Sequence, residues 1–222
     1  MDKYERTLSQ LQKIGDEILE KHNKNNSYYE VGIEYIIEAG FGIHIEAEPL
    51  KERYRVEAFP AIGKSIIYID ISLMDDSRQE RRYRFTLAEE LAHIILHSDI
   101  YKEVKTFNDY FKAERSISED SYHRLDRNAK ELAGIILMPR YTFINRAIEI
   151  RNDLCRSKAK DKNSLTDIEK NKARNQIVRI LMDDFNVNQE PCEIRLERIE
   201  KGLNCSLFEM SLDKSFLKKR KP

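Results

Sequence analysis

The spacing of apolar residues divides the chain into helical segments around one short β-rich stretch. Near the N-terminus an apolar side chain recurs every three or four positions, which predicts an amphipathic helix containing Tyr4, Leu8, Leu11, Ile14 and Ile18. Residues 27–30, Ser-Tyr-Tyr-Glu, have the pattern of a capping box and predict a second helix through about residue 39. Three β-rich segments separated by Pro and Gly then predict an antiparallel sheet of short strands at 43–47, 54–59 and 65–71.

Helical patterns dominate the rest of the chain. They predict helices at about 82–97, 120–137, 141–156, 166–184 and 191–201. Residues 99–119 are polar and irregular and form either a lid or a disordered loop, and their aromatic side chains suit a lid. The lysine-rich stretch 157–163 is the best candidate linker. We therefore expect an α+β protein with a metallopeptidase-like domain at 1–156 and a helical extension with a basic tail at 157–222.

Composition excludes several classes of protein. The 39 basic and 39 acidic residues give a formal net charge of zero, which does not favour a nucleic-acid or anionic-membrane binder. The longest apolar runs have about six residues, far short of the roughly 20 that span a bilayer. Three scattered cysteines form no CxxC pair, as is typical of a reducing compartment. These features predict a cytoplasmic protein without a membrane partner. Residues 176–203 have a helix-turn-helix rhythm, but their balanced charge favours helix packing over DNA binding.

The helix at 82–97 carries the candidate chemistry. Residues 84–97 read Arg-Phe-Thr-Leu-Ala-Glu-Glu-Leu-Ala-His-Ile-Ile-Leu-His, which is the zinc-protease pattern H-E-x-x-H with its first histidine replaced by Glu89. Side chains four residues apart share one helix face, so Glu89 and His93 occupy the two metal-ligand positions. Glu90 occupies the position of the general base that activates a metal-bound water. His97 lies one turn further along the same face.

A pair of glutamates on a helix is usually a solvated surface, but the apolar residues around this pair predict that the helix is buried. Burying Glu89, Glu90 and His93 without partners is costly, which favours a site of some kind. His97 taken alone is more typical of a hydrogen-bonded structural histidine. A relocated metal site remains as an alternative, in which His93 and His97 are joined by His123 or Asp99.

Two motifs in this order resemble the ImmA/IrrE metallopeptidase family. The family's helix typically reads R-F-T-L-A-H-E-L-G-H-L-L-L-H, and its second motif, E-x-x-A-N-x-F-A-x-x-L-L-M-P, is similar to residues 126–139, Asp-Arg-Asn-Ala-Lys-Glu-Leu-Ala-Gly-Ile-Ile-Leu-Met-Pro. The resemblance implies a gluzincin-like, zincin-type core. It places the metal ligands at Glu89, His93 and Asp126 and the catalytic glutamate at Glu90.

Three departures from the family pattern fall at this implied site. Glu89 replaces the first histidine, Asp126 replaces a glutamate, and Lys130 replaces a small residue that helps to orient a ligand. Two carboxylates and one imidazole bind Zn²⁺ less well than the family's ligand set and favour Mn²⁺ or Fe²⁺ relatively more. If no metal is bound, like charges so close cannot all stay ionised, so one group takes up a proton or a cation enters, and Lys130 is the candidate cation.

The resemblance implies two functions. One is a metal-dependent endopeptidase that cuts a repressor-type transcription regulator in mobile-element or stress regulation, with Glu90 passing a proton from water to the leaving amine. The alternative is a catalytically inactive pseudo-peptidase that binds a regulatory protein in the old substrate cleft. The departures favour the second function, and the retained Glu90 and His93 favour the first.

Overall fold

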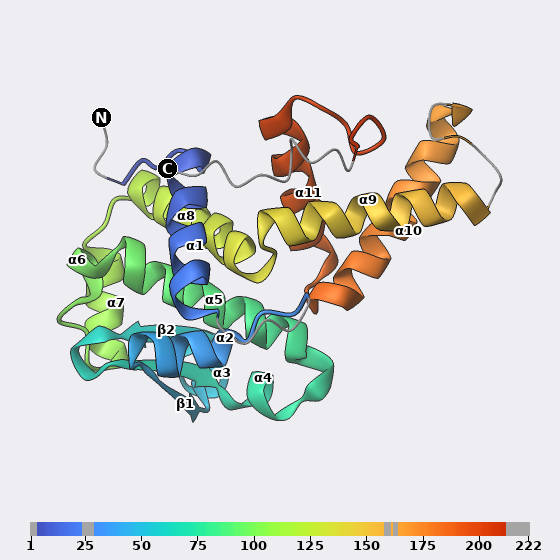
Figure 1. Ribbon diagram of the computed structural model, residues 1–222. Helices are drawn as coiled ribbons and strands as arrows, with labels where there is room; N and C mark the ends of the chain where they lie inside the picture. The colour runs from blue at the N-terminus through green and yellow to red at the C-terminus, as the bar shows by residue number, and fades with distance from the viewer. Residues whose placement is uncertain (1–3, 24–28, 158–160, 162–163, 212–222) are drawn as a thin grey trace. The chain divides into compact units, whose positions relative to one another are not determined.

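The computed structural model describes residues 4–23, 29–157, 161 and 164–211, and it divides into two compact units (Figure 1). The first unit comprises the described residues up to 23 together with 31–137, and the second comprises 29–30 and 138–211. The predicted boundary at 156/157 stays a prediction. In the structure the helix that ends at Ser157 belongs with the helices that follow it. The predicted basic tail at 218–221 lies outside the described residues.

The first unit surrounds a small sheet with helices, so the predicted α+β class is confirmed. Its longer helices are α1 (Leu8–His22), α5 (Glu80–Leu96), α7 (Phe107–Arg115) and α8 (Glu119–Leu137). Shorter helices are α2 (Ile33–Tyr35), α3 (Leu50–Tyr54), α4 (Ile71–Asp75) and α6 (Ser98–Tyr101), with a π-helical turn at Ile36–Gly40 and 3-10 turns at Ile62–Lys64 and Ser77–Gln79. The strands are β1 (His44–Glu48), β2 (Ala58–Ala61) and β3 (Ile66–Asp70).

Helix α1 shows how the sequence pattern produces packing. Thr7 and Gln10 form a capping box that satisfies backbone N–H groups at the start of the helix. The apolar stripe then buries Leu11 and Ile18, and α1 packs against α8. Gly15 allows the close approach, because a Cβ atom there would overlap the side chain of Ile135 on α8.

The sheet is mixed, so the prediction of an antiparallel sheet was wrong for one of its two pairings. The strand order is β1-β3-β2, with β3 parallel to β1 and antiparallel to β2. The reason lies in residues 49–55, where helix α3 follows Pro49 and ends at Arg55 in the left-handed conformation. This helix includes Tyr54, the first residue of the predicted second strand. It leads the chain away from the edge of β1, so that β2 does not pair with β1. The hairpin that follows then places β3 in the middle.

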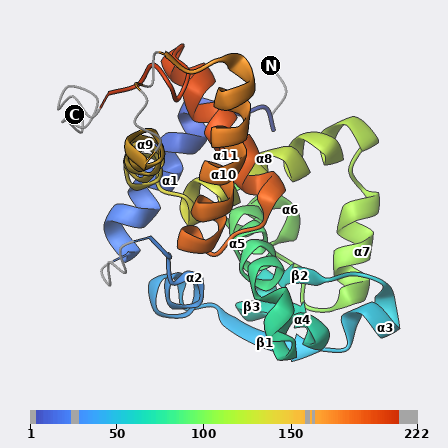
Figure 2. The ribbon, with the colours of Figure 1, turned by 90° about the vertical axis from the view of Figure 1, so that its right-hand side faces the viewer.

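Residues 99–119 are mostly helical rather than irregular. Helix α7 begins with a capping box between Thr106 and Asp109, and it lies beside β2 in both views (Figures 1 and 2). Tyr101 at the end of α6 is almost fully buried. Aromatic side chains from both helices extend a core cluster that consists of Leu50, Phe59, Ala61, Tyr101 and Val104.

The second unit is helical and contains α9 (Arg140–Ser157), α10 (Asp167–Phe185) and α11 (Gln189–Leu203). The predicted capping box at Thr166 and Glu169 is present at the start of α10. Arg151 is buried and donates to the backbone oxygens of Leu207 and Met210, so it ties the segment after α11 to α9.

Three further sequence predictions concern the helix-turn-helix region, the capping box at 27–30 and membrane insertion. Arg195 in the predicted helix-turn-helix region is buried and donates to the backbone oxygen of Met138. Of the predicted capping box at 27–30, Ser27 and Tyr28 lie outside the described residues, and α2 begins at Ile33. Across the described ranges, no helix has the length and apolar character needed to cross a membrane.

Candidate functional site

Helix α5 presents the predicted signature between the sheet and α8. It packs on β2 and β3 and along α8 (Figures 1 and 2). Leu87, Ala88, Leu91 and Ala92 are fully buried, which fixes the rotation of the helix. Glu89, Glu90 and His93 are half-buried. The helical spacing expected from the sequence therefore places these three side chains on one stretch of α5.

Helix α8 contributes one acidic and one basic side chain to the site. Asp126 and Lys130 are one turn apart on α8, and the Lys130 Nζ atom lies 2.9 Å from each carboxylate oxygen of Asp126. The Lys130 side chain is 51% exposed and that of Asp126 is 30% exposed. Both residues act electrostatically on Glu89, with Lys130 lowering its pKa and Asp126 raising it. The structure thus brings Glu89, Asp126 and Lys130 into one electrostatic cluster.

The two glutamates on α5 have strongly perturbed proton affinities. Burial raises the pKa of Glu89 to about 7, with Lys130 opposing the change and Asp126 and Glu57 adding to it. Burial also raises the pKa of Glu90 well above its ordinary value, and the negative charges of Glu89 and Glu114 add to that effect. A raised pKa is typical of a group placed to exchange protons, but it also follows from packing carboxylates together. Burial and the neighbouring charges therefore favour the protonated form of Glu90 more than they would for an exposed glutamate.

His93 and His97 form a neutral pair at the end of α5. Their Nδ1 atoms are 3.2 Å apart, so one ring donates to the other. Burial lowers the pKa of His93 to about 4, helped by the charge of Lys130. Burial also lowers the pKa of His97 to about 3, and this residue is 2% exposed. His97 is therefore buried and hydrogen-bonded to His93, and its structural role stays a prediction.

Helices α6 and α7 form a wall beside Glu90 and His93. The Tyr101 ring meets the His93 ring edge-on at 5.8 Å between centroids, and its hydroxyl donates a hydrogen bond to Glu114 on α7. Burial raises the pKa of Glu114, although the Tyr101 hydrogen bond opposes this change. The sequence suggested a lid from the aromatic residues but missed Glu114. The signal available was the Thr106–Asp109 capping pattern, which predicts α7 and so places Glu114 on a helix.

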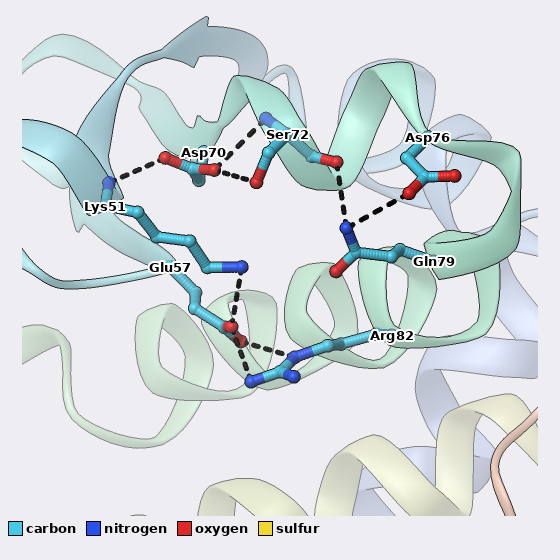
Figure 3. Close-up of polar contacts among 7 residues, drawn as sticks. All are labelled: Lys51, Glu57, Asp70, Ser72, Asp76, Gln79 and Arg82. Atoms are coloured by element: carbon cyan, nitrogen blue, oxygen red, sulfur yellow. Dashed lines mark hydrogen bonds and ion pairs between the residues drawn. The ribbon is translucent and has the colours of Figure 1, made fainter.

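A hydrogen-bond network fixes the sheet end of the site (Figure 3). Asp70 at the end of β3 is 2% exposed and accepts from the backbone N–H of Lys51 at 2.6 Å and of Ser72 at 3.1 Å. Burial alone would raise the pKa of Asp70, but these hydrogen bonds lower it. Because Asp70 caps α4 and holds α3, it determines how the chain leaves the sheet before entering α5.

Glu57 extends this network to the site helix (Figure 3). Its carboxylate accepts from Arg82 Nε at 2.9 Å and pairs with Lys51 Nζ at 3.1 Å. Arg82 is in the first turn of α5, and the charge of Glu57 contributes to the raised pKa of Glu89. No local sequence pattern points to Glu57, because its contact with the site helix is to Arg82, which lies 25 residues further along the chain.

The structure does not bring every candidate residue to the cluster. His123 is exposed on α8, where it pairs with Glu119 at 3.9 Å. Asp99 is also exposed, in α6, and its charge acts on His97. The relocated site built from His93 and His97 with either of these residues stays a prediction.

A metal centre places strict requirements on the arrangement of its donors. Structural and catalytic metal sites use three or more converging donors. Among the residues that the structure describes, no three His, Cys, Asp or Glu side chains are grouped so that they could hold an ion. Lys130 contacts both oxygens of Asp126, and His93 uses Nδ1 for His97. The side chains in this arrangement therefore do not fit a divalent metal.

Comparisons with known proteins agree with the fold. Residues 38–166, more than half of the chain, match the model of the family described as IrrE N-terminal-like domain (Peptidase_M78). A solved structure described as a Mycobacterium tuberculosis transcriptional regulator is similar, with a TM-score of 0.53 and 14% identity. The match covers 84% of this chain and 46% of that one, so this chain spans about half its length. The search of curated proteins gave no significant match.

Proposed function

This chain belongs to the IrrE N-terminal-like peptidase family, and we propose that it is a catalytically inactive member that binds a regulatory protein at its former substrate site. One observation carries the proposal: Lys130 lies on the carboxylate of Asp126, the position where the family pattern implies a metal ligand. A positive charge at that position opposes binding of a divalent cation. The partner we propose is a repressor-type transcription regulator. The similar solved structure is that of a transcriptional regulator, which is compatible with a regulatory role for this chain.

The retained residues support a second candidate function, that of a metal-dependent endopeptidase acting on such a regulator. Glu90 and His93 keep the base and ligand positions on α5, and Glu90 has the raised pKa that suits proton transfer. In this function Glu90 would accept a proton from the attacking water and donate it to the leaving amine. The residues that would hold a metal ion in this function are Glu89, His93 and Asp126, and the ion would supply Lewis-acid chemistry there. The arrangement of these side chains, with Lys130 on Asp126, counts against this candidate.

Cleavage and binding assays separate the two functions. The probes are purified helix-turn-helix repressors, incubated with untagged protein in the presence of Zn²⁺, Mn²⁺ or Fe²⁺. We expect a stable complex without cleavage, and we expect Glu90→Gln to bind equally well. Cleavage by the parent protein that disappears in Glu90→Gln would refute the proposal and establish the endopeptidase.

A positive control guards against an unsuitable substrate. The triple variant Glu89→His, Asp126→Glu, Lys130→Asn restores the residue types that the family pattern has at these three positions. If this variant cuts a repressor that the parent only binds, the partner lies in the substrate site and the parent lacks only the metal chemistry. If neither protein binds any of the repressors, the proposed partner class is wrong.

A further inference from the structure

Helices α6 and α7 lie against both the candidate site and one edge of the sheet. In the strand order β1-β3-β2, β2 is an outer strand, and α7 lies beside it (Figures 1 and 2). Tyr101 in α6 places its ring edge-on to the ring of His93, with 5.8 Å between the centroids. One continuous segment, residues 98–115, therefore covers both the outer strand and a histidine of the site helix. This segment is named the cover.

The linker between the two helices attaches the cover to the end of β2. Val104 belongs to the same buried cluster as Phe59 and Ala61. Its backbone oxygen accepts a hydrogen bond from the N–H of Gly63 at 2.9 Å, just after β2. A Cβ atom at Gly63 would lie 3.1 Å from that oxygen, so the glycine permits this close approach. The chain thus makes with itself the kind of main-chain contact that an added peptide makes at the edge of a sheet.

The cover is held by few buried groups. Within residues 98–115, all of which the structure describes, only Tyr101 and Val104 are buried. Helix α7 has no buried residue and is attached through one row of side chains. In that row the rings of Phe107 and Tyr110 lie 5.7 and 5.5 Å from the ring of Phe59 on β2. A segment with so few buried contacts can open at a lower free energy than the whole domain unfolds.

The two ends of this row meet the site. Glu114, in the last turn of α7, accepts a hydrogen bond from the hydroxyl of Tyr101, whose ring contacts His93. Tyr101 also stacks on Tyr110, with 6.0 Å between the ring centroids. Displacing α7 therefore removes two of the contacts that hold Tyr101 over His93, so the sheet edge and the site open together.

We propose that the cover is an autoinhibitory element, which occupies the surface beside β2 and His93 and must move away before a regulatory protein can bind there. The identity of that partner rests on the proposed function, whereas the movement itself depends on no partner. A ligand that binds only the open form has its apparent affinity reduced by the fraction of molecules that are open. Loosening the cover should therefore strengthen binding, whereas removing a contact residue of an open site would weaken it.

Amide hydrogen exchange of the parent protein, followed by NMR, tests the movement without any substitution. The N–H of Gly63 reports on the cover, because its acceptor is the backbone oxygen of Val104. This N–H and the amides of α7 should exchange through one shared opening, at least roughly ten-fold faster than the amides in the buried part of α8. Exchange of the α7 amides only at the rate of those α8 amides would overturn the proposal.

Chemical modification by diethyl pyrocarbonate measures access to His93. Phe107→Ala removes a ring that packs on Phe59, and Phe111→Ala is the matched control, because it removes an exposed ring from the same helix. Mass spectrometry follows modification at each histidine, with the exposed His44 as the internal standard. Relative to the parent, the rate at His93 should rise roughly ten-fold in Phe107→Ala and stay unchanged in Phe111→Ala.

A folded Phe107→Ala protein with the parent's rate at His93 would refute the proposal. If this variant does not fold, the exchange measurement on the parent protein decides the matter, because it needs no substitution.

Binding of a purified helix-turn-helix repressor then tests the inhibition. The repressor should bind Phe107→Ala roughly ten-fold more tightly than it binds the parent or Phe111→Ala. Equal or weaker binding to Phe107→Ala, despite faster modification of His93, would show that the cover opens without controlling access and would overturn the proposal. Failure of all three proteins to bind any repressor would instead reject the proposed partner class, and the rates at His93 alone would then confirm or overturn the closed site.

Discussion

Replacing Glu89 with glutamine should stabilise the protein at alkaline pH and leave it nearly unchanged at acidic pH. Burial raises the pKa of this carboxyl group from an ordinary 4.5 to about 7. The folded state therefore holds the proton more tightly than the unfolded state, and the free energy of unfolding falls as the pH rises through this window. Glutamine has the same shape but does not ionise, so this decline should disappear in the variant.

The size of the effect follows from the shift in proton affinity. Each tenfold change in affinity corresponds to about 1.4 kcal/mol, so ionised Glu89 lowers the free energy of unfolding by up to about 3 kcal/mol above pH 7. Since Glu90 is coupled to Glu89, the variant also relieves part of the repulsion that Glu90 feels. We expect the difference between variant and parent to be close to zero near pH 4 and largest near pH 8.

Urea unfolding followed by circular dichroism at a series of pH values measures this difference. Glu46→Gln is the matched control, because it removes one carboxylate from an exposed position on β1. Its difference from the parent should stay small at every pH. A Glu89→Gln protein that is less stable than the parent near pH 8 would contradict the reasoning, because it would show that ionised Glu89 is stabilised by a bound cation.

Three further changes test other parts of the fold by the same unfolding measurement. Tyr101→Phe removes the hydrogen bond to Glu114 and should cost about 1–3 kcal/mol, whereas no loss would mean that Glu114 finds another donor. Gly15→Ala should lower the free energy of unfolding by about 1–3 kcal/mol, because the added methyl group overpacks the contact between α1 and α8. Gly202→Ala is the control, since its methyl group meets open space within a helix, and it should raise the free energy of unfolding by up to about 1 kcal/mol. Equal effects of the two variants would contradict the close approach of α1 to α8. Asp70→Asn should lower stability above about pH 4 and make less difference as the acid is protonated, because hydrogen bonds lower the pKa of Asp70; a pH-independent loss would assign its role to shape alone.

Much of the fold follows from apolar periodicity in the longer elements. The helix predicted at 82–97 is present as Glu80–Leu96, and the one predicted at 120–137 is present as Glu119–Leu137. The misses are short elements or long-range pairings. Helices α3 and α6 have five and four residues, too few to show a helical period. The parallel pairing of β1 with β3 depends on where α3 returns the chain, which no local pattern encodes.

The residues of the candidate site also separate into those that local sequence patterns predict and those that depend on long-range packing. Glu89, Glu90 and His93 could be placed together from the sequence, because helical geometry alone puts them on one stretch of α5. Glu57 and Glu114 could not, since one comes from a segment before β2 and the other from α7. Their influence on the α5 carboxylates exists only once the sheet and α7 pack against that helix.

The outer position of β1 bears on how the protein behaves at high concentration. A strand at the edge of a sheet offers backbone groups to any passing strand, and this is a common route to aggregation. In β1 that edge is only five residues long and carries Glu46 and Glu48, both at least partly exposed. A second copy docking edge to edge would bring like charges together. The sheet is therefore protected against growing into a larger assembly through β1, and replacing both glutamates with valine should make the protein prone to self-association.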